Sequence, residues 1–230
     1  MYPMTPQTRR FIEFAVVVMI ALSGGSGGGQ VQARDAVSEA ARGLFEKHKE
    51  ALVVVTVAAR LVATTDGDPF AKPAQKRRTL GVTIHPDNGL IVISNAAVDP
   101  SVGLRGKKAK MGEKVVTIET ARAEFEKVEI RYGDSEIIQG KIIKQDPGAD
   151  VAFVLPDAAT AKALDKTTFE AVNFGSPASP ESADQVVGLS RSSAAYGYMP
   201  TVIVGRVTGV FKGEFRTFYV TTAGTAQGIP

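Results

Sequence analysis

Short apolar runs rich in β-branched residues, separated by turn-forming residues, constrain the fold of this chain more than any other feature. Valine, isoleucine and threonine favour strands, whereas the glycine, proline, asparagine and aspartate between the runs favour turns. The pattern therefore predicts a mainly β protein built from many short, mostly antiparallel strands. The clearest runs are LVVVTV (52–57), GVTI (81–84), LIVIS (90–94), VAFVL (151–155) and VIV (202–204).

The same pattern assigns elements along the chain. Apolar residues at helical spacing predict a short helix over 35–50. Asn88-Gly89, between GVTIHP and LIVISN, predicts a hairpin, because this pair supplies the positive φ angles of a tight turn. Loops are expected at 64–78, 99–112 and 190–200, and a helical turn or a loop at 157–166. Further strands are expected at 114–120, 128–132, 136–144, 150–155, 172–174, 185–189, 201–211 and 215–221.

Composition excludes several classes of protein. The chain has 230 residues, no cysteine and a formal net charge of +3. Without cysteine there is no disulfide and no thiolate ligand for a metal, and we expect neither metal nor cofactor. The net charge is too small to argue for a nucleic-acid partner. Two basic stretches, 76–78 and 105–114, lack interleaved aromatic residues, so a solvated loop face is favoured over an anion-binding patch.

The first 33 residues resemble a targeting segment. Arg9 and Arg10 precede the apolar run FAVVVMIAL at 14–22, which is shorter than the roughly 20 residues that a membrane-spanning helix needs. Small residues follow, and Val31-Gln32-Ala33 suits signal peptidase. We expect cleavage after Ala33 and export to the periplasm or the outside of the cell. The alternative is an uncleaved segment that anchors the protein in the membrane.

The order of motifs resembles trypsin-like serine peptidases of the HtrA/Deg type. That family has Gly-x-Ile-x-Thr-Asn-x-His-Val, then Asp-x-x-x-Asp-Leu-Ala-Leu-Leu, and later Leu-Gly-Ser, Gly-x-Val-x-Gly and Gly-Asn-Ser-Gly-Gly-Pro. The resemblance covers about residues 36–230 and implies a chymotrypsin/trypsin-like double antiparallel β-barrel with the active site between the barrels. The matching stretches here are GLIVISNAAV (89–98), DPGADVAFV (146–154), FGS (174–176), GRVTG (205–209) and TAQGIP (225–230).

The catalytic positions depart from the family pattern. The resemblance places Ala97 at the histidine, Asp150 at the aspartate and Gln227 at the serine of the triad. Alanine accepts no proton, and a glutamine amide is not a nucleophile, so the chemistry is expected to be lost. Of the two histidines, His48 lies far along the chain from the matching position, and His85 lies at the hairpin turn, at the other end of the strand that ends near Ala97.

Two features of these segments have open interpretations. Asp150 is either a relic of the triad or a structural residue whose carboxylate accepts backbone N–H groups, and the structural interpretation is favoured because no histidine needs orienting. The loop at 190–200 carries Tyr196, Tyr198 and Met199, which could grip a ligand or simply pack within the loop.

We therefore expect a signal peptide (1–33), a helical segment (34–50), a first barrel (51–156) and a partial second barrel (157–230). The family has further strands after the nucleophile loop. No such strands follow in this sequence, and three explanations are open: the sequence is a fragment of a longer protein, a partner supplies the strands, or the gene product is shortened.

The expected function is that of an exported, catalytically inactive pseudopeptidase that binds unfolded or extended polypeptide. No nucleic acid is expected as a partner, a membrane only through the uncleaved segment, and a homo-oligomer such as a trimer is compatible with the family. The alternatives are an active serine endopeptidase of the HtrA type and a structural module of the cell envelope.

Overall fold

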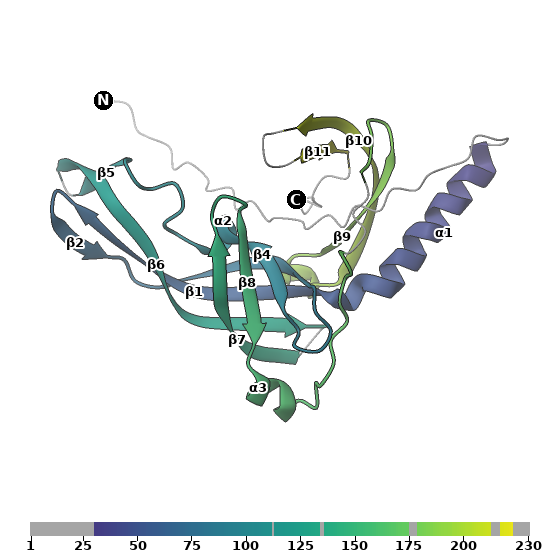
Figure 1. The fold of residues 1–230 in the computed structure, drawn as a ribbon, viewed down its shortest axis with the longest axis horizontal. Helices are drawn as coiled ribbons and strands as arrows, with labels where there is room; N and C mark the ends of the chain where they lie inside the picture. Colours follow the sequence, from purple (N-terminus) through teal and green to yellow (C-terminus); the bar gives the residue numbers. More distant parts are fainter. Residues whose placement is uncertain (1–29, 112, 134–135, 175–178, 213–216, 223–230) are drawn as a thin grey trace.

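The computed structural model describes residues 30–111, 113–133, 136–174, 179–212 and 217–222 (Figure 1). The described part begins with a helix and continues mainly as strands. Its three helices are α1 (Gln30–His48), α2 (Asn95–Val98) and α3 (Ala158–Ala163), with 3₁₀ turns η1 (Lys49–Ala51) and η2 (Ala194–Tyr196). The strands are β1 (Leu52–Thr65), β2 (Asp68–Ala71), β3 (Gln75–Thr83), β4 (Ile91–Ser94), β5 (Lys108–Met111), β6 (Lys114–Tyr132), β7 (Glu136–Asp146), β8 (Val151–Pro156), β9 (Gln185–Arg191), β10 (Pro200–Lys212) and β11 (Thr217–Thr221).

Six antiparallel strands form a closed barrel. The hydrogen-bonded order is β1-β3-β4-β8-β7-β6, and β6 pairs again with β1, so that these strands leave no free edge between them. The short strands β2 and β5 extend the outer ends of β1 and β6. Closure therefore satisfies the backbone hydrogen-bonding groups that an open sheet of this length would expose.

The barrel interior is filled by alternate residues of its strands. Along β1, Val53, Val55 and Val57 point inward and are fully buried, as the two-residue period of a strand requires. Two glycines let the wall approach this core closely. A Cβ on Gly81 would lie 2.6 Å from Ile91 Cγ2, and one on Gly140 would lie 2.7 Å from Ile130 Cδ1 and 3.0 Å from the Leu155 carbonyl oxygen. The interior thus leaves no room for a side chain at either position.

A second, three-stranded sheet packs beside the barrel. Its order is β11-β10-β9, and in Figure 1 it stands above the barrel next to α1. A separate apolar cluster joins it to the outer barrel face, with residues from α1, β1, β3 and β9. Its buried members are Ala41, Ala51, Leu52, Val82, Val172, Val187 and Leu189.

Several predicted elements are confirmed. The helix expected at 35–50 is present, although it starts earlier, and the expected hairpin is the antiparallel pair β3–β4. Gly89 has φ +66°, as a turn glycine should. The stretch 157–166 contains α3, whose N-cap Asp157 accepts hydrogen bonds from the backbone N–H and the hydroxyl of Thr160. These bonds hold the pKa of Asp157 below its usual value.

Other predictions of local structure are wrong. Residues 64–78 are not a loop, because β1 extends to Thr65 and both β2 and the start of β3 lie in this range. Residues 99–112 contain β5. The two strands expected at 114–120 and 128–132 are one strand, β6, because its charged middle pairs with β1 along its length. No strand forms at 172–174, although the Val172 N–H donates to the Thr83 carbonyl (2.9 Å).

The mainly β fold with a closed barrel was therefore expected from the sequence, whereas the finer expectation of a double barrel goes beyond what the fold shows. Within the described residues, no helix has both the length and the apolar character needed to cross a membrane. The predicted signal peptide lies mostly outside those residues.

Candidate functional site

The segment that follows β4 and the turn that precedes β8 meet at one end of the barrel. The two strands pair, with Ser94 opposite Val151, and this register places Asp150 against the start of α2. The Asp150 side chain accepts two hydrogen bonds there, one from the Ser94 hydroxyl to Oδ2 (2.9 Å) and one from the Ala96 N–H to Oδ1 (2.7 Å). The carboxylate is thus tied to a neighbouring segment more than 50 positions earlier in the chain.

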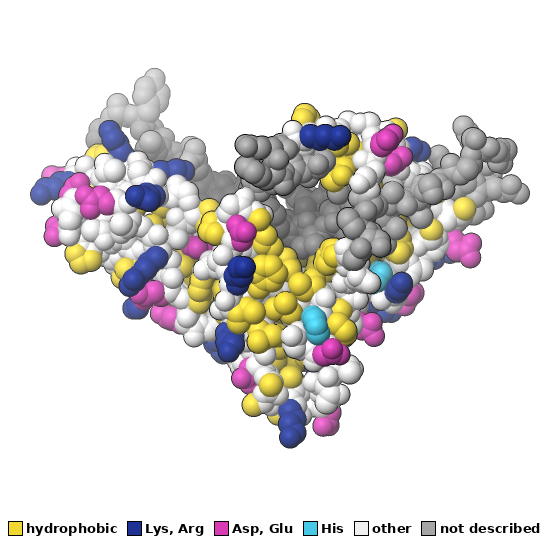
Figure 2. All heavy atoms as spheres, in the orientation of Figure 1, with side chains coloured by type: hydrophobic (Ala, Val, Ile, Leu, Met, Phe, Trp, Pro, Cys, Tyr) yellow, Lys and Arg dark blue, Asp and Glu magenta, His cyan; other side chains and the backbone are white. Residues whose placement is uncertain are grey.

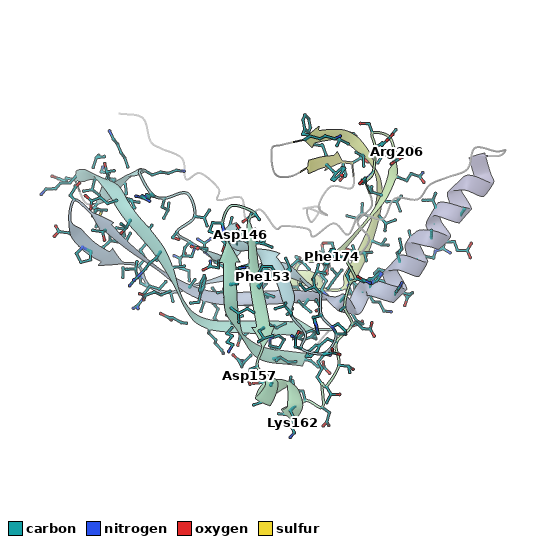
Figure 3. The ribbon with its side chains drawn as sticks, viewed as in Figure 1. Asp146, Phe153, Asp157, Lys162, Phe174 and Arg206 are labelled. Carbon is teal, nitrogen blue, oxygen red and sulfur yellow. The ribbon has the colours of Figure 1, made fainter. Side chains whose placement is uncertain are left out.

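The turn that carries Asp150 is itself fixed. Asp146, labelled beside α2 in Figure 3, accepts a hydrogen bond from the Ala149 N–H (3.0 Å). Asp150 has φ +55°, and its carbonyl accepts from the Asn95 N–H (3.2 Å). Aspartate tolerates this left-handed conformation better than most residues. The sequence therefore suits both the turn and the side-chain contacts.

Ala97 lies in the same cluster. Its N–H donates to the Ser94 hydroxyl oxygen (3.3 Å), and that hydroxyl donates in turn to Asp150. The structure therefore brings together two of the three positions that the resemblance singled out. The third, Gln227, lies outside the described residues.

No histidine lies in the part of this cluster that the structure describes. His85 is exposed in the loop before β4, where its Nδ1 accepts from the Asp87 N–H (3.3 Å), and α2 lies beyond the opposite end of that strand. His48 ends α1, and partial burial lowers its pKa. Activation of a serine needs a base within hydrogen-bond reach. The described part of the cluster therefore offers a carboxylate, a hydroxyl and amide groups, but no imidazole.

The barrel surface beside the cluster is apolar. Figure 2 shows hydrophobic side chains gathered over β4 and β8. Val92 and Phe153 are cross-strand partners there, and both remain partly exposed. Phe174, labelled in Figure 3, is 55% exposed. An apolar surface next to the cluster suits a partner with apolar side chains better than a small ion.

A metal centre finds no support in the part of the chain that the structure describes, because no three histidine, aspartate or glutamate side chains gather there. The loop between β9 and β10 also differs from the simple loop expected. Tyr196 and Met199 are largely exposed, while Tyr198 packs its ring against arginine side chains from the barrel. Sequence analysis missed this contact, because the aromatic residue and the arginines are far apart in the chain.

Comparison with known proteins adds no assignment: no family model matches the chain, and no curated protein matches it.

Proposed function

We propose that the protein is an exported, HtrA-type peptidase-fold protein that has lost catalysis and binds extended polypeptide. One observation carries the proposal: in a closed six-stranded antiparallel barrel, Asp150 contacts the segment that bears Ala97, where the mechanism would need a histidine. The Asp150 carboxylate is engaged by Ser94 and Ala96, which is a structural use of that side chain. On this proposal the three-stranded sheet is the remnant of a second barrel.

Two surfaces support polypeptide binding. The apolar face over β4 and β8 lies beside the cluster. The sheet of β9 to β11 is open as far as it is described, since β9 and β11 each pair with β10 alone. An extended peptide that joins such an edge gains main-chain hydrogen bonds, and pockets or apolar patches on the surface select alternate side chains.

Loss of catalysis is tested with a fluorophosphonate probe that labels activated serines. We expect no labelling of the purified protein, with an active serine peptidase as the positive control. Suppose instead that a serine is labelled and that its replacement with alanine abolishes the labelling. That result would favour the alternative function, an active endopeptidase.

Strand addition is tested with a matched pair of peptides. One is an extended apolar decapeptide labelled with a fluorophore, and the other has the same side chains with alternate backbone nitrogens methylated. Methylation removes the donors that pair with a strand edge but keeps the side chains. We expect at least tenfold weaker binding of the methylated peptide in a polarisation titration. Equal binding of the two, or no binding of either, would contradict the proposal and leave a structural module as the better account.

A further inference from the structure

A pocket lies where the loop after β9 meets the outer barrel face. The pocket is small and partly open to solvent. The barrel contributes residues of β1 and β3, and the loop contributes the residues on either side of η2. The side chains used below are Val54, Arg78, Leu80, Arg191, Ser192 and Tyr198. Ligand sites occur preferentially at such junctions between packed units.

The buried side chain of Arg191 fixes one side of the pocket. Arg191 is only 5% exposed, and its guanidinium donates to three backbone carbonyls: Leu52 (2.7 Å), Tyr198 (3.0 Å) and Lys49 (3.2 Å). These bonds hold η1, the start of β1 and the loop in one place, so they fix the shape of the pocket on this side.

Two arginines of the barrel lie near the ring of Tyr198. The guanidinium carbon of Arg78 lies 5.3 Å from the centre of the Tyr198 ring, and that of Arg131 lies 5.7 Å from the same ring. Tyr198 has φ +59°, a costly conformation for a residue of this size. Hydrogen bonds within the loop stabilise it, including Tyr198 N–H to the Ser193 carbonyl (3.3 Å) and Ser192 N–H to the Met199 carbonyl (2.8 Å).

Arg78 keeps hydrogen-bonding capacity for a ligand. Its Nε donates weakly to the Thr56 hydroxyl (3.4 Å), and no described carboxylate forms an ion pair with it. The terminal N–H groups of an arginine can pair with both oxygens of a carboxylate. None of the described residues that line the pocket is acidic.

Val54 and Leu80 form an apolar part of the lining. Val54 is buried and Leu80 is partly buried, and they lie directly opposite each other on paired strands. The two hydroxyls of the lining, Thr79 and Ser192, already donate to backbone carbonyls, so an anion bound at Arg78 would have hydrocarbon beside it. This favours a monocarboxylate with an apolar body over a phosphate, whose dianion needs several donors.

We propose that this pocket is a binding site for small apolar carboxylates, with the carboxylate on Arg78 and the apolar body against Val54 and Leu80. The inference does not rest on the proposed peptide binding or on the peptidase resemblance. It depends only on Arg78, the ring of Tyr198 and the apolar side chains of Val54 and Leu80.

The test compares N-acetylleucine with N-acetylleucinamide, which has the same body without the charge. Each is titrated into the isotope-labelled full chain while the backbone amide signals are followed by NMR. We expect the acid to shift the amides of residues 54, 80, 192 and 198, and to bind at least tenfold more tightly than the amide. Equal affinity for the two, shifts confined to other regions, or no binding of the acid would overturn the proposal.

Two charge-removing variants test whether the ligand carboxylate binds at Arg78. Arg78→Gln should weaken binding of N-acetylleucine at least tenfold, whereas Arg105→Gln, an equal loss of charge in the exposed loop before β5, should change it less than twofold. Tyr198→Asn retains a residue that tolerates positive φ and should also weaken binding. Thermal unfolding verifies that each variant is folded. Equal effects of Arg78→Gln and Arg105→Gln, or tighter binding of inorganic phosphate than of N-acetylleucine, would reject this ligand class.

Discussion

Asp150 shows at the level of a single residue how a side chain matched to a catalytic position can serve structure. Its carboxylate joins the turn before β8 to the start of α2 through Ser94 and Ala96. Asp150→Ala should lower the free energy of unfolding by about 2–3 kcal/mol, because two hydrogen bonds to a charged group are lost and alanine is strained at φ +55°. Urea denaturation measures this difference.

Asp150→Asn is the matched variant. Asparagine tolerates the same φ and keeps one acceptor oxygen, so it should cost about half as much as alanine. A stability unchanged in both variants would mean that the contacts to α2 contribute nothing, and that the structural interpretation of Asp150 is wrong.

Tyr132 provides a second prediction at this scale. The residue is 3% exposed, and burial raises the pKa of its hydroxyl. The hydroxyl lies near that of Thr83, but neither makes a hydrogen bond of normal geometry. The unfolded chain loses the Tyr132 proton near pH 10 while the folded chain keeps it, so this residue's contribution to stability is complete below pH 10 and declines above it.

Tyr132→Phe should therefore flatten the fall of stability between pH 9 and 11.5 and change it by less than about 1 kcal/mol at pH 7. Tyr196→Phe, at a side chain that is 59% exposed, should leave the profile unchanged. Denaturant unfolding at a series of pH values measures both. The prediction fails if the two variants have the same alkaline profile.

At some positions the barrel strands pack so closely against neighbouring side chains that only glycine fits. Gly140→Ala should destabilise the protein by about 2 kcal/mol or more, because the new Cβ meets Ile130 Cδ1 and the backbone carbonyl of Leu155. Gly43→Ala is the control in α1, where nothing lies within 4 Å, and should be neutral or stabilise by up to about 1 kcal/mol. Thermal unfolding measures the stability of both variants. A loss of stability in Gly43→Ala alone would contradict the close packing inferred at Gly140.

The strand β6 shows what the sequence could and could not reveal about elements. Its apolar ends were recognisable, but its middle was not, since four of the seven residues 121–127 are charged. In the structure these charges lie on the outer face, where Arg122 bonds Glu124 (2.9 Å) and Lys127 bonds Glu129 (2.6 Å). Tertiary pairing with β1 outweighs the local preference. The hairpin β3–β4 was predictable, because its turn chemistry is local.

The candidate site, too, could be predicted only where its signal is local in the sequence. The positions 97 and 150 could be singled out from motif order, but the hydrogen bonds of Asp150 depend on the register of β4 and β8. The pocket of Arg78, Arg191 and Tyr198 could not be anticipated, since its members come from three separate segments and Arg78 was expected in a loop.

The whole molecule combines a closed barrel with an open sheet, and the two should differ in local stability. We expect backbone amides of β1, β4 and β8 to exchange with solvent at least tenfold more slowly than those of β10 and β11, because closure leaves no edge to fray. Hydrogen–deuterium exchange measured by NMR tests this. Equal protection throughout would indicate one cooperative unit instead.

Arg191→Leu should increase the difference in local stability between the barrel and the three-stranded sheet. It removes the donors to Leu52 and Lys49 that attach β9 to the barrel, so exchange in β9 and β10 should accelerate while the barrel core is unaffected. Loss of protection in the barrel to the same extent would mean that the arginine stabilises the whole fold.

The barrel also occupies one uninterrupted stretch of chain. Its strands run from Leu52 to Pro156, and the closing pair joins β1 to β6 within that stretch. During synthesis the ribosome therefore delivers every barrel strand before it delivers β9. The barrel can close while the later strands are still being translated, and its outer face then serves as the surface on which the nascent sheet is assembled.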